Sequence, residues 1–227
     1  MLKYIQAGDS MRLFLIRHGE SMQNTKENSI LRLPDHKVYL TKEGREDAKG
    51  AARFLDSYVK SCDIDLDNSI LWVSPFTRTR ETAGIINDTL QIQEVREDYR
   101  LIEQQYGLFS DGMIDELREL YPDEFSLYDN YYQNEGKFYV RLPQGESPMD
   151  VAIRTNLFLN DLKLCKEENH FIVTHGTTMR TMVMNIYHYL PEWFAKEPNM
   201  QNCSVRLVEP DSNIDAYIYK GPLVKKK

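Results

Sequence analysis

The sequence predicts a three-layer α/β/α protein with a mostly parallel central sheet, and three observations favour this class. Short apolar runs at residues 13–16, 69–74 and 171–174 have the length and composition of buried strands. Segments with the period of amphipathic helices, at residues 41–59 and 147–164, separate these runs. Alternation of strands and helices of this length is typical of a sheet with helices on both faces.

Length and composition narrow the class further. The 227 residues fit a single domain, residues 1–227, with a small inserted lobe. There are 28 Lys and Arg against 35 Asp and Glu, a net charge of −7, and the acidic residues are scattered. We therefore expect no nucleic-acid partner, and an anionic substrate would need a local basic pocket.

The chain also lacks the apolar segments of a membrane or secreted protein. No run of about 18 apolar residues occurs, and residues 1–11 lack the apolar core of a signal peptide. Three cysteines far apart, without a Cys-x-x-Cys pair, are typical of reduced thiols. We expect a cytoplasmic protein with no membrane partner, and a homodimer remains open.

The first half of the chain supplies two strands and a helix in order. After the first strand, residues 21–38 show little periodicity and are predicted to form a loop. Thr41, three positions before Gly44, predicts a capped helix that continues to residue 59. A second strand at residues 69–74 is followed by a threonine-rich cationic stretch that contains Arg78 and begins another helix, and a short strand is expected near residues 92–95.

The second half begins with a lobe rich in tyrosine and acidic residues. We predict a lid at residues 108–142, with helices interrupted at Pro122 and Gly136, and its tyrosines in the core and the lid. Ser147 or Pro148 begins a helix. One face of that helix carries Met149, Ile153, Leu157 and Leu164. Strands at residues 171–174, 204–208 and 216–219 complete the sheet.

Chemically active residues follow the predicted strands. Arg17 and His18 follow the first, Arg78 the second, and His175 the run at residues 171–174, while Glu103 comes after the short strand. If these strands are parallel neighbours, the five side chains meet at one edge of the sheet. Two permanently charged guanidinium forks suit a phosphate group. The sequence therefore predicts a phosphate pocket.

A histidine in such a pocket attacks phosphorus only through an unprotonated ring nitrogen. The other nitrogen must then carry the proton and donate it to an acceptor such as a backbone carbonyl, while flanking arginines disfavour the imidazolium. Glu103 would protonate the leaving oxygen and later take a proton from water, which requires a pKa raised toward neutrality. His175 is expected to bind phosphate as the imidazolium, which predicts a limited pH window for turnover.

Residues 15–21, together with Asn24, resemble the signature of the histidine phosphatase superfamily, phosphoglycerate-mutase-like branch. Further similar blocks occur in the family's order across residues 12–208: residues 40–44, 74–83, 100–107, 145–147 and 174–180. The resemblance implies that His18 is the phosphorylated nucleophile and Glu103 the proton donor. It assigns the other contacts to the phosphoryl group and substrate to Arg17, Arg78, His175, Asn24, Ser21 and the backbone at Gly176, with no cofactor. Residues 138–147 are also similar to a broad-specificity subgroup.

Other polar residues receive structural predictions. His170 and His188 are expected to be structural or exposed, and Arg80 and Arg100 to form ion pairs. His36 could reach the mouth of the pocket. A metal site is disfavoured because Arg17 and Arg78 would repel a divalent cation next to the histidines.

Three functions remain open from the sequence. The leading hypothesis is a metal-independent phosphatase that acts on small phosphate monoesters. A phosphoglycerate mutase would use the same residues, but similar mutases carry a long insertion where only 42 positions (145 − 103) separate Glu103 from Gly145. A non-catalytic module that binds phosphorylated ligands is the third.

Overall fold

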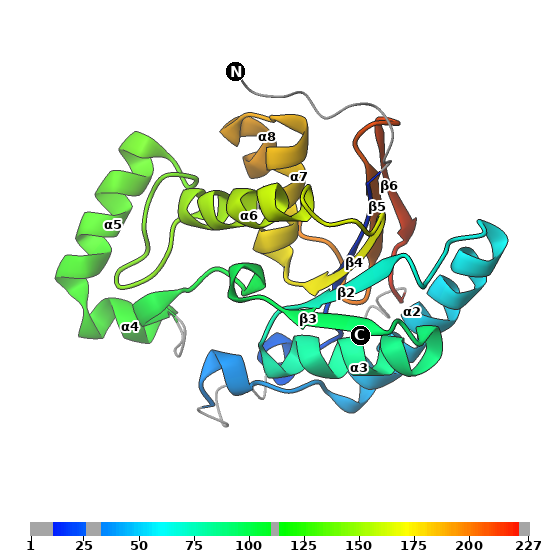
Figure 1. The fold of residues 1–227 in the computed structure, drawn as a ribbon. Helices are drawn as coiled ribbons and strands as arrows, with labels where there is room; N and C mark the ends of the chain where they lie inside the picture. The colour runs from blue at the N-terminus through cyan, green and yellow to red at the C-terminus, as the bar shows by residue number, and fades with distance from the viewer. Residues whose placement is uncertain (1–10, 26–32, 110–113, 223–227) are drawn as a thin grey trace, which may run out of the picture.

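The computed structural model describes residues 11–25, 33–109 and 114–222. Its strands are β1 (Arg12–Arg17), β2 (Ser69–Val73), β3 (Glu94–Glu97), β4 (Asn169–Thr174), β5 (Val205–Glu209) and β6 (Ile214–Tyr219). They form one sheet in the order β3-β2-β4-β1-β5-β6 (Figure 1). The first four are parallel, whereas β5 is antiparallel to both β1 and β6. The predicted mostly parallel sheet is confirmed.

The long helices that cover the sheet are α2 (Lys42–Ser61), α3 (Thr77–Leu90), α6 (Pro148–Leu162) and α7 (Gly176–Tyr187). Strand residues alternate between the two faces: Phe14 and Ile16 join one hydrophobic cluster with α2 and α3, and Leu13 and Leu15 join another with α6 and α7. Figure 1 shows these helix pairs on opposite sides of the sheet, with α8 (Pro191–Lys196) beside α7. The three layers are therefore confirmed.

Side-chain caps set the starts of two helices as the sequence predicts. The Thr41 hydroxyl accepts a hydrogen bond from the Gly44 amide at 2.9 Å at the start of α2. Ser147 caps α6 in a reciprocal arrangement with Asp150. No helix in the described part of the chain combines the length and hydrophobicity that a membrane span needs.

The edge strand β3 begins two residues later than predicted. The Asn87 side chain accepts a hydrogen bond from the Ile92 amide at 2.9 Å and donates one to the Ile92 carbonyl at 3.1 Å. Ile92 is thereby tied to the end of α3 and buried there, so its backbone is not available to the ladder. The strand forms over Glu94–Glu97 instead.

The predicted lid contains two helices, α4 (Ile114–Leu120) and α5 (Pro122–Glu135), which stand beyond the sheet in Figure 1. Pro122 is the first residue of α5 and Gly136 caps its end, as the sequence predicts. In α5 only Phe125 is buried, and the exposed Tyr131 and Tyr132 belong to the lid and not to the core. The other residues of α5 are exposed or half-buried, so this lobe has little hydrophobic core.

The parallel register brings the predicted site residues together. Arg17 pairs with Thr174 at the last position of β1 and β4, so His18 and His175 follow side by side. Val73 at the end of β2 pairs with Val173, which places Ser74 next to them. The predicted loop at residues 21–38 contains two short 3-10 helices in its described part, η1 (Met22–Asn24) and η2 (Asp35–Lys37).

Candidate active site

Four of the predicted catalytic residues lie at the carboxyl ends of β1, β2 and β4, and Glu103 approaches them from the loop after β3. The ring centroids of His18 and His175 are 5.1 Å apart. The charges of Arg78 and Arg17 act on both rings, and the charge of Glu103 acts on Arg17. The fold therefore assembles the group of residues that the sequence predicts.

His18 is buried and held in one tautomer. Its Nδ1 lies 2.7 Å from the Gly19 carbonyl oxygen, which can only accept, so Nδ1 carries the proton. Burial lowers the pKa of His18 well below its usual value, and the charges of Arg78 and Arg17 lower it further. The ring is neutral with Nε2 unprotonated, which is the state that a nucleophile requires.

Gly19 is required by its surroundings. A Cβ at this position would lie 2.5 Å from the Gly44 carbonyl oxygen, closer than any side chain allows. The Gly19 amide donates to the Thr82 hydroxyl at 3.0 Å. These contacts fix the turn whose carbonyl orients His18.

His175 is anchored through its other nitrogen. Its Nε2 lies 2.8 Å from the Ser74 hydroxyl, while the buried Nδ1 has no hydrogen-bond partner in the protein. Burial and then the charge of Arg78 lower the pKa of His175 well below its usual value, so the ring is neutral in the protein by itself, and the imidazolium expected with bound phosphate stays a prediction. A neutral His175 still donates from Nδ1 if the Ser74 hydroxyl donates to Nε2.

Hydrogen bonds from the terminal guanidinium nitrogens hold both predicted arginines in place. Arg78 is buried, and its Nη1 donates to the Asp35 carbonyl oxygen and to Asp35 Oδ1, both at 2.8 Å. Arg17 donates from Nη1 to the Met200 carbonyl, and burial lowers its pKa. The Nε atoms of both arginines are buried without a partner.

Arg180, one turn into α7, completes this set. Its Nη1 donates to the Glu197 carbonyl at 3.0 Å, its Nε is buried without a partner, and its charge interacts with Glu103 and Arg17. In the described part of the chain, four of the six buried side-chain atoms without a partner therefore belong to Arg17, Arg78, Arg180 and His175. Buried donors without acceptors are uncommon, and together they suit a ligand with several acceptor oxygens.

Glu103 faces the start of α7. Its Oε2 accepts a hydrogen bond from the Thr177 amide at 3.3 Å, and its Oε1 accepts one from the Gln104 amide at 2.9 Å. The charge of Glu103 also acts on Tyr106. Burial first and then this charge raise the pKa of Tyr106 to about 12. The carboxylate is thus positioned by backbone groups rather than neutralised by an arginine.

The Gly-Glu-Ser block at residues 145–147 clamps the loop that carries Glu103. The Glu146 carboxylate accepts from the Gln105 amide at 2.9 Å and from Arg154 Nε at 2.9 Å. The Glu146 amide donates to the Gln105 carbonyl at 2.8 Å, and a Cβ at Gly145 would lie 2.5 Å from the same oxygen. The block joins α6 to the loop after β3.

Of the predicted substrate-binding residues, Asn24 is exposed, whereas Ser21 and Gly176 are buried. The buried Ser21 hydroxyl donates to Asn24 Oδ1 at 3.1 Å, so Ser21 orients Asn24. Asn24 is exposed, and its Nδ2 is the donor that this arrangement turns to other partners. Gly176 is the first residue of α7, where helix amide groups lack intrahelical acceptors, and a Cβ there would lie 3.8 Å from Arg17 Nε.

The remaining polar residues considered in the sequence analysis are exposed, ion-paired or structural. His36 is exposed, and its neighbour Asp35 reaches the pocket instead, a contact for which the sequence gives no signal. Arg80 pairs with Glu97, as predicted for a structural ion pair. Arg100 also forms ion pairs, with Asp98 and Asp161. His170 is buried in β4 and accepts from the Trp72 indole at 3.2 Å, which is structural.

The fold and this cluster of residues define an α/β protein with buried arginines and two neutral histidines at the carboxyl edge of its parallel strands. Residues 13–215 match the model of the histidine phosphatase superfamily (branch 1), and the chain belongs to this family. It is 29% identical to the phosphoglycerate mutase-like protein AT74H of Arabidopsis thaliana, over 87% of this chain and 73% of that protein.

Two further similarities agree with this membership. The chain is 30% identical to phosphoserine phosphatase 1 of Hydrogenobacter thermophilus, over 76% of this chain and 74% of that protein. Its fold matches the crystal structure of the alpha-ribazole phosphatase from Shigella flexneri with a TM-score of 0.72 at 20% identity, over 93% of this chain and 96% of that one. The match at this identity supports the fold.

Proposed function

We propose that this protein is a phosphatase that hydrolyses small phosphate monoesters through a phosphohistidine at His18. One observation carries the proposal: the Nε2 of His18 is left unprotonated in a cluster that holds four buried donors without an acceptor in the protein, three of them on residues next to His18 and one on Arg180, next to Arg17 and Glu103. These donors belong to Arg17, Arg78, Arg180 and His175. A phosphoryl group supplies the missing acceptors and the electrophile together.

In the first step, the Nε2 lone pair of His18 forms a bond to phosphorus as the bond to the ester oxygen breaks. The protonated carboxyl group of Glu103 gives its proton to that oxygen, which leaves as an alcohol. The guanidinium groups and the His175 Nδ1–H bear the charge on the other phosphoryl oxygens. Asn24 and the amide group of Gly176 add further donors.

In the second step, a water oxygen attacks phosphorus and the bond to Nε2 breaks. The Glu103 carboxylate takes the proton from this water, which restores the acid and releases inorganic phosphate. The reaction as written uses neither metal nor cofactor. Arg17 and Arg78 support this, because two guanidinium groups beside the histidines repel a divalent cation.

Covalent labelling tests the nucleophile. The protein is mixed with ³²P-labelled p-nitrophenyl phosphate in the presence of EDTA and quenched in alkali, in which phosphohistidine survives. We expect labelled wild-type protein, no label in His18→Ala, and normal labelling in His36→Ala, whose side chain is exposed. Label that persists in His18→Ala overturns the assignment.

Product analysis separates the alternatives. The similarity to a phosphoglycerate mutase-like protein makes phosphoglycerate the substrate on which to compare isomerisation with phosphate release. Faster release of phosphate supports the phosphatase, and faster isomerisation supports a mutase that uses the same residues. No turnover across sugar phosphates, phosphoserine and phosphoglycerates would instead favour a binding module.

A further inference from the structure

Helix α6 has two apolar faces, and only one of them is packed. Its inner face buries Phe158, Leu159 and Leu162 against the sheet. The residues that the sequence groups on one apolar face lie on the other side: Met149 is 42% exposed, Ile153 53% and Leu157 55%. Their spacing of four residues places them within one stripe along the helix. An amphipathic surface helix normally presents polar residues there.

The stripe is also free of charge. Asn156 and Asn160, which are exposed, share this side of the helix and are neutral. The charged residues of α6 form ion pairs with other segments: Asp150 with Arg141, Arg154 with Glu146, and Asp161 with Arg100. In a chain with 28% charged residues, an uncharged apolar stripe is typical of a protein contact.

We propose that this stripe is the contact of a homodimer in which two α6 helices pack antiparallel about a two-fold axis at Ile153. A two-fold contact must be self-complementary. An antiparallel pairing centred on Ile153 places Met149 against Leu157 of the second copy, apolar against apolar. Each copy carries a net charge of −7, and a contact without charges avoids that repulsion.

The exposed charges near the two ends of the stripe have opposite signs, which favours the antiparallel orientation. Arg141, which precedes α6 and pairs with Asp150, is 71% exposed, and Asp161, which lies near the end of α6 and pairs with Arg100, is 62% exposed. Antiparallel packing brings each arginine toward the aspartate of the second copy. Parallel packing would set like charges against each other.

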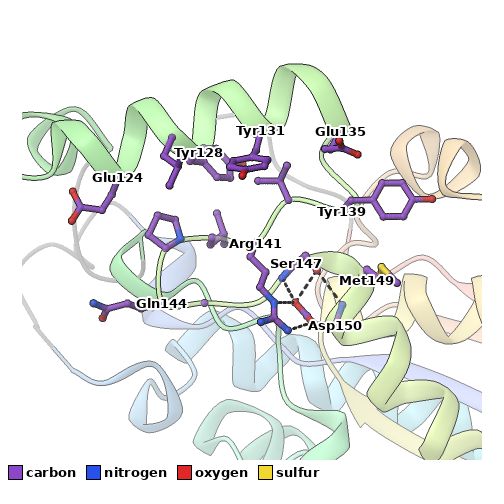
Figure 2. A pocket seen from close by; sticks show the side chains of 15 residues that line it. Glu124, Tyr128, Tyr131, Glu135, Tyr139, Arg141, Gln144, Ser147, Met149 and Asp150 are labelled. Carbon is purple, nitrogen blue, oxygen red and sulfur yellow. Dashed lines mark hydrogen bonds and ion pairs between the residues drawn. The ribbon is translucent and has the colours of Figure 1, made fainter.

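A protruding side chain and a cavity lie at opposite ends of α6. Leu164, just beyond α6, is 82% exposed. Antiparallel packing brings this leucine toward the N-terminal end of α6 in the second copy. Leu142 helps to line a cavity of about 640 Å³ between α5 and residues 139–145, which Met149 also lines. Figure 2 shows this cavity, with Tyr131 on α5 and Arg141 reaching Asp150 at the start of α6.

The contact involves one helix and one loop, so the dimer should be weak. Interfaces at the small end of the range bind transiently, and we expect a dissociation constant in the micromolar range. Sedimentation equilibrium from 1 to 300 µM should show the mass rising toward that of a dimer. A wild-type protein that stays monomeric at 300 µM overturns the proposal.

Ile153→Asp tests the axis, because it sets two carboxylates against each other. We expect the dissociation constant to rise at least 30-fold, with the circular dichroism spectrum unchanged because the side chain is half exposed. The control is Leu190→Asp, which is 69% exposed at the start of α8 and should leave the dimer intact. A dimer that survives Ile153→Asp contradicts this interface.

Disulfide trapping tests the register independently of any phosphatase activity. In a background of Cys62→Ser and Cys165→Ser, Ile153→Cys should cross-link under mild oxidation, because both copies meet at the axis. Asn160→Cys should not, since the two cysteines would lie roughly 20 Å apart along the helices, beyond disulfide reach. Equal cross-linking at both positions rules the register out.

Discussion

A histidine follows each of the strands β1 and β4, and the two histidines are held by different hydrogen bonds. Each strand leads to a buried His-Gly pair, and the two rings lie 5.1 Å apart. Burial lowers the pKa of both histidines. His18, however, is anchored through Nδ1 by the Gly19 carbonyl, whereas His175 is anchored through Nε2 by the Ser74 hydroxyl.

The chemistry of the anchoring group decides the role of each ring. A carbonyl only accepts, so it fixes the proton of His18 on Nδ1 and leaves the Nε2 lone pair available for attack. A hydroxyl can donate, so it lets His175 keep its proton on Nδ1, the atom without a partner in the protein. Two similar motifs in one parallel sheet are thus suited to a nucleophile and a donor.

Replacing each ring by asparagine should separate these roles most clearly. We expect His18→Asn to lower turnover by about 10⁴-fold or more, because the nucleophile is lost. His175→Asn should lower it by about 10²- to 10³-fold, because one donor to the transition state is lost, and His18 should still become labelled. Steady-state kinetics and ³²P labelling measure both. The distinction fails if both variants lose labelling alike.

Replacing Glu103, which is positioned by the Thr177 amide at the start of α7, should give the next largest effect. Glu103→Gln should lower kcat/KM for an alkyl phosphate by about 10²- to 10⁴-fold. The loss for p-nitrophenyl phosphate should be much smaller, because that leaving group needs no proton. Glu43→Gln, at an exposed position in α2, serves as the control. Equal losses for both substrates would contradict a role as proton donor.

Ser74→Ala removes the hydroxyl that anchors His175. One hydrogen bond is worth about 1 kcal/mol, so kcat/KM should fall about 5- to 10-fold and inhibition by inorganic phosphate should weaken. Ser69→Ala is a matched control, since Ser69 is also buried, at the other end of β2, but its hydroxyl donates to the Asp65 carbonyl. The same loss in both variants would show a general effect on the strand.

The smallest effect concerns stability against pH. The pKa of His18 and of His175 is lowered in the folded chain but near 6.5 when unfolded, so the unfolded chain binds more protons below pH 6.5. The free energy of unfolding should therefore decrease on acidification, by up to about 1.4 kcal/mol per pH unit for each histidine.

Urea unfolding at pH 7, 6 and 5 measures this dependence. His18→Asn and His175→Asn should each flatten it. Some dependence should remain, because burial lowers the pKa of His170 to about 4 and adds a change of the same sign. An unchanged slope in both variants would mean that neither ring is held neutral.

The sequence predicts the strand-end blocks because each is local. An apolar run followed by a His-Gly pair or by an arginine-rich helix start is complete within a few residues, and the parallel sheet aligns these ends without further information. His18, His175, Arg17 and Arg78 are brought together in this way. Glu103 requires only that its loop return to the same edge.

Contacts between distant segments are absent from any local pattern. Arg78 donates to Asp35, which lies 43 positions away in the sequence. The Gln105 amide donates to Glu146, which lies 41 positions away. Arg180 lies one helical turn beyond the Thr-His-Gly block, a spacing that could have indicated its site role because it returns the side chain to the same end of the helix. The tautomers of the two histidines depend on the anchoring groups, which only the folded chain defines.

Helix α6 shows the limit of periodicity. The sequence determines that it is a helix, that Ser147 caps it and that it carries apolar stripes. Periodicity identifies a stripe but not its partner, and two stripes on one helix compete for the same sheet. The tertiary structure buries Phe158 and Leu159 and leaves Ile153 and Leu157 half exposed, because only one face can pack against β-strands fixed by their neighbours.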